Sequence, residues 1–185
     1  MKINKQKITD KKFTKGFTLL ELLVVVLIIG ILATISLPQY KKVIVKSRVA
    51  QMLSLGKAIW EAKERYYMLH NEYIRDISVL DIDIPKSCLK FGNGYYECGD
   101  YWLIDNNITN VAINYCSKGH NSNLPVCRQD QDFQLKWIQS NPEGSVNLRP
   151  FNPNERSCYV YNNSKIGHYI CQNLEGFVYY PYEVR

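Results

Sequence analysis

A single carboxylate stands inside the most apolar stretch of the chain. Glu21 is the only ionisable side chain between Phe17 and Leu37. An ionised group within a membrane helix is costly, and such residues are usually functional and paired. Glu21 lies about one helical turn after Phe17, which follows a Lys15-Gly16 step. A cut after Gly16 would leave an amino group at the helix start, within reach of a carboxylate on a neighbouring copy, so the spacing indicates an assembly device.

The stretch that carries Glu21 is long enough to cross a membrane. Its 21 residues, 17–37, at about 1.5 Å per helical residue span a hydrocarbon core of about 30 Å. A secretory signal peptide would need a small-x-small cleavage site after the apolar region, and neither residues 33–35 nor 36–38 provide one. An ordinary single-pass anchor explains the hydrophobicity but neither the Gly-Phe step nor the carboxylate.

The residues from Gly16 to Val26 read Gly-Phe-Thr-Leu-Leu-Glu-Leu-Leu-Val-Val-Val. This segment resembles the cleavage and methylation signal of type IV pilins and of the related type II secretion pseudopilins. The resemblance covers residues 15–40. It implies that a prepilin peptidase cuts between Gly16 and Phe17 and methylates the Phe17 amine. It also implies that Glu21 pairs with the N-terminus of a neighbouring subunit.

Two further residues interrupt the apolar helix. Pro38 cannot donate a backbone hydrogen bond and clashes with the preceding turn, which predicts at least a bend at the membrane exit. By resemblance to pilins, the helix loosens from Gly30 to Pro38 when subunits pack into a filament.

The segment before the apolar stretch is strongly basic. Residues 1–16 contain six lysines and one acid, so this side is expected to stay in the cytoplasm and the C-terminal bulk to lie outside. The formal net charge of the whole chain is +6. Without the segment 17 basic and 16 acidic side chains remain, so nucleic-acid binding is not indicated and the basicity is a targeting feature.

The rest of the chain predicts an α+β fold with a pilin-like lollipop shape. Apolar residues recur at steps of three and four beyond Tyr40, so one helix is expected to continue and to end between Tyr67 and Asp76. Residues 111–115 and 133–138 alternate in polarity, which predicts half-buried strands of an antiparallel sheet, and residues 71–85, 121–125 and 141–144 are expected loops. The expected organisation is a cleaved leader (1–16), a transmembrane assembly helix (17–40), an amphipathic half of the helix (41–75) and a disulfide-stapled, β-rich head (76–185).

All six cysteines lie in the expected head, and an even number in an exported domain argues for disulfides. If residues 92–94 form a hairpin loop, Cys88 faces Cys98. A symmetric hairpin about residues 162–165 likewise sets Cys158 opposite Cys171. The remaining pair, by elimination, is Cys116 with Cys127. A bridge between the last two cysteines also resembles the C-terminal disulfide of pilins and is less typical of the major secretion pseudopilin.

Other chemistry finds little support in the sequence. Cys116, His120 and Cys127 lie close together, but their spacing matches no compact zinc signature. No histidine (70, 120 or 168) sits in a nucleophile motif. We therefore expect neither a metal nor another cofactor, and no enzyme.

The sequence thus predicts a structural filament subunit, held in the bacterial inner membrane and then polymerised. The resemblance implies as partners other copies of the chain, other pilins, the prepilin peptidase, an inner-membrane assembly platform and, before assembly, the lipid bilayer. The product would be a cell-surface pilus for adhesion, motility or uptake, or a periplasmic pseudopilus. The alternatives are a pseudopilin of a type II secretion system, a minor pilin, and a monomeric membrane-anchored binding domain.

Overall fold

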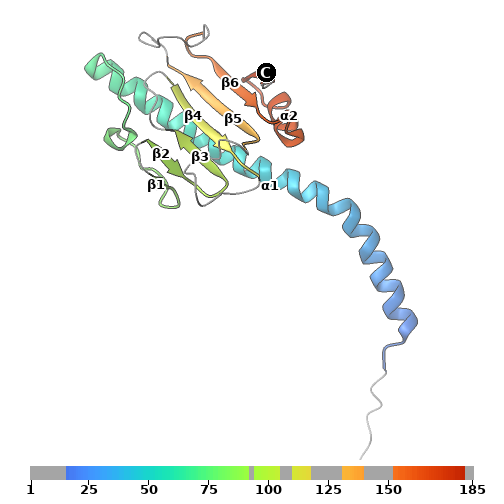
Figure 1. The fold of residues 1–185 in the computed structure, drawn as a ribbon. Helices are drawn as coiled ribbons and strands as arrows, with labels where there is room; N and C mark the ends of the chain where they lie inside the picture. Colours follow the sequence, from blue (N-terminus) through green and yellow to red (C-terminus); the bar gives the residue numbers. More distant parts are fainter. Residues whose placement is uncertain (1–15, 92–93, 105–109, 118–130, 140–151, 182–185) are drawn as a thin grey trace, which may run out of the picture. The chain divides into compact units, whose positions relative to one another are not determined.

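A computed structural model describes residues 16–91, 94–104, 110–117, 131–139 and 152–181. Their ribbon is coloured along the chain in Figure 1. The chain divides into two compact units, one up to Lys41 and one from Lys42 onward.

One long helix, α1, runs from Leu19 to His70 and continues through Pro38. Its end confirms the prediction of a stop between Tyr67 and Asp76. The helix stops because Asn71 adopts a left-handed conformation, with φ of 57°, which asparagine tolerates better than most residues. The Asn71 N–H still donates to the Tyr67 carbonyl at 2.7 Å, so one of the terminal carbonyls is satisfied.

The second unit contains a seven-stranded sheet in the order β1 to β7 (Figure 1). The pairs are antiparallel from β1 through β6, as predicted, but β6 and β7 are parallel. A parallel pair needs a crossover connection, and a short helix, α2, supplies it between these strands. The bounds are β1 Leu89–Phe91, β2 Tyr95–Glu97, β3 Tyr101–Ile104, β4 Asn110–Tyr115, β5 Phe133–Ile138, β6 Arg156–Val160, α2 Lys165–Gln172 and β7 Val178–Pro181, with a 3-10 turn at Ile77–Val79.

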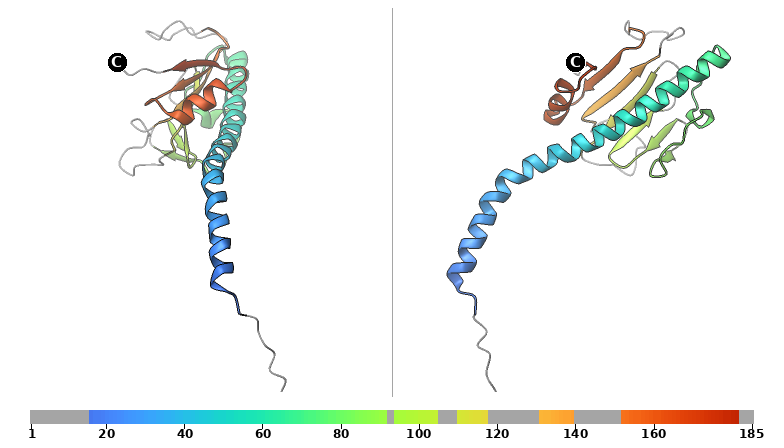
Figure 2. Two further views of the ribbon diagram at one scale, coloured as in Figure 1. Left: turned by 90° about the vertical axis from the view of Figure 1, so that its right-hand side faces the viewer. Right: turned by 180° about the vertical axis from the view of Figure 1, so that it is seen from behind.

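The outer part of α1 crosses one face of this sheet, as both views in Figure 2 show. The helix and sheet approach so closely at Gly56 that a Cβ there would lie 2.2 Å from the Trp137 ring. The Trp60 indole N–H donates to the Ile138 carbonyl at 2.9 Å. The helix buries a stripe of apolar side chains at steps of three and four against the sheet: Val45, Val49, Met52, Leu55, Ile59 and Ala62.

The prediction that residues 111–115 and 133–138 form strands is confirmed, but the prediction of half-burial is wrong. Every residue of β4 is buried, and in β5 only Lys136 is partly exposed. Both are central strands, and their polar side chains partly satisfy one another. The Gln134 side-chain amide donates to Asn114 Oδ1 at 2.6 Å, which lowers the cost of burying both groups. Burial lowers the pKa of Lys136.

The hairpin predicted around residues 92–94 has the expected register. Leu89 pairs with Glu97 and Phe91 with Tyr95. Gly94 has φ of 100°, a conformation that favours glycine, while residues 92–93 lie outside the described part. Just beyond the paired residues, Cys88 and Cys98 form a disulfide with Cα atoms 4.1 Å apart.

The hairpin predicted around residues 162–165 is wrong, although its two cysteines do pair. Cys158 and Cys171 form a disulfide with Cα atoms 5.5 Å apart, but Cys171 lies on α2 and not on a strand. The helix forms because Ser164 caps it: its hydroxyl oxygen accepts from the Gly167 N–H at 3.1 Å. Cys158 faces Leu135 and Tyr179 across the sheet.

Candidate assembly site at the start of α1

The first turn of α1 is closed by three hydrogen bonds between Thr18 and Glu21. Thr18 precedes the helix, and its Oγ1 accepts from the Glu21 backbone N–H at 3.2 Å. The Glu21 carboxylate in turn accepts from the Thr18 backbone N–H and from its hydroxyl, each at 2.8 Å. This is a capping box, which satisfies backbone donors that a helix start leaves without partners. Within one subunit, therefore, Thr18 holds the Glu21 carboxylate.

The predicted cleavage step lies just before this turn. Gly16 and Phe17 are not helical, and Phe17 is 73% exposed. A Cβ built on Gly16 would have no atom within 4 Å. The Gly16-Phe17 peptide bond is thus accessible, and the amine that cleavage would create lies next to Thr18 in the chain.

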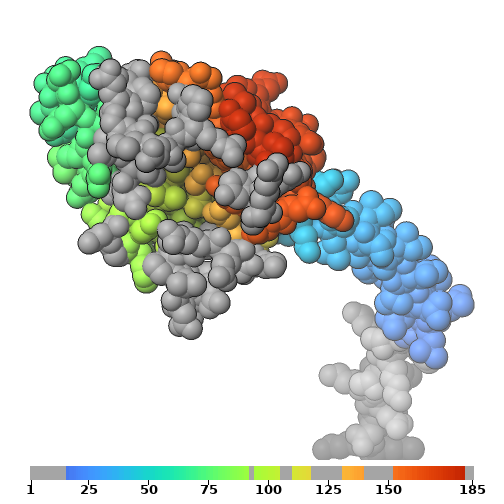
Figure 3. All heavy atoms as spheres, turned by 45° about the horizontal axis from the view of Figure 1, so that its top comes forward, coloured from blue at the N-terminus to red at the C-terminus, as the bar shows by residue number. Residues whose placement is uncertain are grey.

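The helix beyond Glu21 exposes an apolar surface. Every leucine, valine and isoleucine from Leu19 to Leu37 is between 45% and 88% exposed. Figure 3 shows this segment as the blue run of spheres. By length and composition, α1 is the one candidate membrane-spanning helix among the described residues. Such a surface needs lipid or other protein to cover it.

Two hydroxyl side chains of the segment form hydrogen bonds within α1 itself. The Thr34 hydroxyl donates to the Ile31 carbonyl at 2.7 Å, and the Ser36 hydroxyl donates to the Leu32 carbonyl at 2.8 Å. Both side chains thus satisfy themselves on their own helix. A Cβ on Gly30 would meet nothing within 4 Å, so the reason for a glycine there lies outside the isolated subunit.

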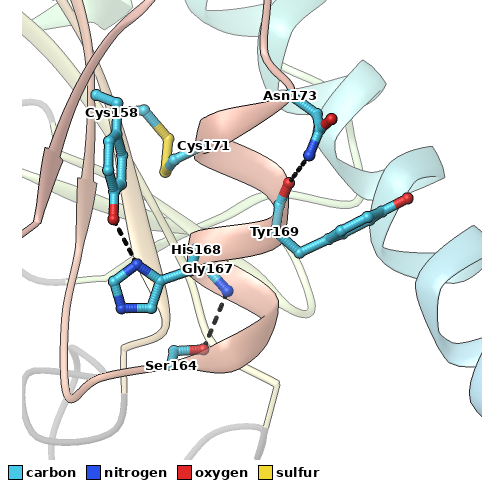
Figure 4. The surroundings of a disulfide bond; sticks show 8 residues. Cys158, Ser164, Gly167, His168, Tyr169, Cys171 and Asn173 are labelled. Atoms are coloured by element: carbon cyan, nitrogen blue, oxygen red, sulfur yellow. Dashed lines mark hydrogen bonds between the residues drawn. A yellow bond between two sulfur atoms is a disulfide. The ribbon is translucent and has the colours of Figure 1, made fainter.

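In the second unit, a disulfide and a histidine attach α2 to the neighbouring strands. Figure 4 shows the Cys158–Cys171 disulfide beside α2, with the His168 ring on the same helix. His168 Nδ1 bonds the Tyr179 hydroxyl, and Nε2 lies 3.2 Å from Asn163 Oδ1. His168 therefore ties α2 to β7 and not to any nucleophile among the described residues.

Some of the other predicted site residues of the head lie outside the part of the chain that the structure describes. Cys116 is disulfide-bonded, whereas Cys127, its predicted partner, and His120 lie outside the described part, as do the expected loops 121–125 and 141–144. His70 Nδ1 lies 3.1 Å from the Tyr66 carbonyl. Among the described residues, no group of three or more His, Cys, Asp or Glu side chains is arranged to hold a metal ion.

Comparison with known proteins identifies the family. The prokaryotic N-terminal methylation motif matches residues 11–37. The type IV major pilin protein PilE1 of Neisseria gonorrhoeae is 33% identical over 133 residues, 69% of this chain and 70% of that protein. PilE, a type IV major pilin protein of the same species, is 37% identical over 131 residues, 69% and 75% of the two chains. This chain belongs to the type IV pilin family.

A shorter match to another relative has a higher identity. The type IV major fimbrial protein FimA of Dichelobacter nodosus is 54% identical over 44 residues, 24% of this pilin and 28% of that protein. No solved structure matches this pilin significantly.

One residue of the assembly site was missed by reasoning from the sequence. Thr18 lies in the pilin-like segment, and the pattern Thr18-Leu-Leu-Glu21 ahead of an apolar run is a capping-box signal that identifies it. The structure brings Thr18 and Glu21 together. A Cβ added to Gly30 would meet no other part of the described chain within 4 Å, and α1 continues through Pro38.

Proposed function

We propose that this type IV pilin is a structural filament subunit, cut between Gly16 and Phe17 by a prepilin peptidase, methylated at Phe17 and polymerised through residues 17–40. The observation that carries the proposal is the exposed apolar helix with one carboxylate next to the cleavage step. The relatives are structural pilins by name, and we propose no enzymatic activity and no cofactor for this chain.

The chemistry of assembly centres on Glu21. In one subunit its carboxylate accepts from Thr18. In a filament it pairs instead with the Phe17 amine of an adjacent subunit. This replaces a local hydrogen bond with an attraction between opposite charges, which is strong where water is scarce. Because cleavage creates the amine, the uncut precursor lacks the partner even though its helix is intact.

The apolar surface provides the filament core but not its specificity. Lipid tails are as apolar as leucine, so moving the residues between Leu19 and Leu37 from lipid into protein gives little hydrophobic gain. Close packing and the Glu21 pair must therefore favour the filament over the membrane. In this account Gly30 and Pro38 mark the part of α1 that loosens when subunits pack.

The route follows from the order of the segments. The basic leader, residues 1–16, stays in the cytoplasm while the subunit waits in the inner membrane with its head outside. An assembly platform in that membrane then extracts it into a pilus. Relatives named major pilin and fimbrial protein, and the disulfide between the last two cysteines, favour a pilus subunit over a secretion pseudopilin.

Mass spectrometry of filaments sheared from the cell surface tests this proposal. We expect this chain to be abundant there, to begin at Phe17 and to carry a methylated N-terminal amine. A surface fibre that disappears when this chain is deleted would indicate a pilus subunit. Loss of protein export on deletion, in cells that show no surface fibre, would instead indicate a pseudopilin. Mature protein that retains residues 1–16 would contradict the filament proposal and favour a membrane-anchored binding domain.

A variant at the cleavage step provides a second test. Gly16→Val places a branched side chain where the peptidase needs an open backbone, so uncut precursor should accumulate in the membrane. Gly30→Val is the matched control, because the same change deeper in the helix leaves the cleavage step intact. Normal processing of Gly16→Val would remove the main support for the proposal.

A further inference from the structure

Two lysines of α1 lie beside the Tyr169 ring of α2 in the second unit, and a third lysine lies on α2 itself. Lys42 and Lys46 of α1 lie with their ammonium groups 4.9 and 5.4 Å from the centroid of the Tyr169 ring. Figure 4 shows that ring pointing from α2 toward α1. Lys165 lies one helical turn before Tyr169 on α2. We call Lys42, Lys46 and Lys165 the lysine cluster.

All three side chains of the lysine cluster are exposed, and none forms an ion pair within the described part of the chain. The Asp132 carboxylate accepts from the Ser164 hydroxyl beside Lys165, but it pairs with no lysine of the cluster. Between Glu21 and Glu61 the sequence contains no Asp or Glu. Some other cations of the second unit are paired, such as Arg48 with Asp100 and Lys57 with Glu61.

The Tyr169 phenol responds to this charge. A hydrogen bond from Lys46, together with the charges of Lys46 and Lys42, lowers the pKa of Tyr169. An aromatic ring with a polar tip, flanked by lysines, is the combination found where protein meets lipid headgroups. The cluster therefore has both the charge and the amphipathic side chain that an anionic lipid surface favours.

Chain connectivity keeps Lys42, the first residue of the cluster, close to the membrane surface. Lys42 is five residues after Leu37, the last residue of the apolar stretch. A helical connection of five residues would measure about 7.5 Å, which reaches the outer edge of the headgroup layer and is about one Debye length at physiological salt. Even a fully extended connection would span at most about 18 Å.

We propose that the lysine cluster binds the phosphate groups of anionic phospholipids on the outer surface of the membrane that holds the subunit before assembly. The proposal rests on the proposed function only in taking the subunit to be membrane-anchored. Each lysine near such a surface is expected to strengthen binding about fivefold. The contact is released when the subunit leaves the bilayer for the filament.

The test titrates a short-chain phosphatidylglycerol onto the full chain in a nonionic detergent and measures bound lipid by native mass spectrometry. The test variant combines Lys42→Gln, Lys46→Gln and Lys165→Gln. The matched control combines Lys57→Gln, Arg75→Gln and Lys86→Gln, which removes the same charge from exposed positions outside the cluster. Thermal unfolding verifies that both variants fold, and Lys165→Glu alone provides a milder second variant.

We expect the wild type to prefer phosphatidylglycerol to phosphatidylcholine, with an affinity that falls as salt rises. The cluster variant should lose on the order of 100-fold in affinity, Lys165→Glu at least about fivefold, and the control less than about twofold. Equal losses in the cluster variant and the control would overturn the proposal, as would no preference between the lipids. Short double-stranded DNA that binds the cluster while phosphatidylglycerol does not would overturn it in favour of a nucleic-acid site. Mass spectrometry of sheared wild-type filaments, which tests the proposed function, depends on none of these outcomes, so the two proposals can fail separately.

Discussion

The same helix behaves differently in its two halves. From Leu19 to Leu37 its leucines, valines and isoleucines are 45% to 88% exposed. From Val45 to Ala62 the apolar stripe that faces the sheet is at most 8% exposed. The outer half is completed by its own chain, whereas the first half can be completed only by lipid or by other subunits. Stability and assembly should therefore respond to different residues.

The largest expected difference concerns core volume. Leu135→Ala, at a fully buried position of β5, should destabilise the head by about 2 to 5 kcal/mol, because it loses transfer free energy and leaves a cavity. Leu27→Ala, at a position 59% exposed, should leave unfolding of the head unchanged. Denaturant unfolding in detergent, followed by Trp fluorescence, measures both. Similar losses in the two variants would mean that the halves are not energetically distinct.

The disulfide between the last two cysteines is expected to have the next largest effect. Replacing Cys158 and Cys171 together by serine should cost the head about 2 to 4 kcal/mol, largely because the unfolded chain regains freedom. The head should then be digested faster by proteases, while insertion of the N-terminal helix stays normal. Peptide mapping of the wild type should link Cys158 to Cys171. A double variant as resistant as the wild type would show that packing alone holds α2.

Two glycines of α1 allow the same substitution in each half. Gly56→Ala forces a methyl group toward the Trp137 ring and should cost about 1 to 3 kcal/mol by overpacking. Gly30→Ala meets nothing within 4 Å in the subunit and should keep the head at wild-type stability. Thermal unfolding compares them directly. A more stable Gly56→Ala head would contradict the close approach of α1 and the sheet.

The smallest expected effect concerns the capping box. Thr18→Val removes the hydroxyl that accepts from the Glu21 N–H and donates to its carboxylate. Losing a cap costs about 1 kcal/mol, which corresponds to about fivefold faster hydrogen exchange at the Glu21 amide. Amides of the sheet should exchange as in the wild type. Unchanged exchange at Glu21 would show that the cap does not hold the first turn.

The sequence was sufficient where one physical signal dominated. The long apolar run predicted the first half of α1, and glycine near position 94 predicted the register of β1 and β2, because few other residues adopt φ of 100°. The alternation of Val111 to Tyr115 identified a strand but not its burial. Which faces of a strand are covered depends on its place in the sheet, and that is decided by distant parts of the chain.

The hairpin around residues 162–165 was predicted wrongly because the short segment after it fits both the strand period and the helix period. Ile166, His168 and Ile170 alternate as in a strand, yet Ile166 and Ile170 also lie one helical turn apart. The Ser164 hydroxyl caps the first turn and thereby favours the helix, a signal that hydrophobic spacing does not contain. At Thr18 as at Ser164, a single hydroxyl fixes the start of a helix, so capping residues deserve as much weight as hydrophobic spacing.

Glu21→Gln, expressed as the only subunit, tests the central claim most directly. Glutamine keeps the shape and leaves the Gly16-Phe17 step intact but cannot form an ion pair with the Phe17 amine. The variant should be processed, inserted and folded normally, yet yield little sheared filament. Glu61→Gln is the same change in the outer half of α1, at a side chain that is 45% exposed, and this variant should assemble like the wild type. Wild-type amounts of filament from Glu21→Gln would show that packing suffices and that the pairing is dispensable.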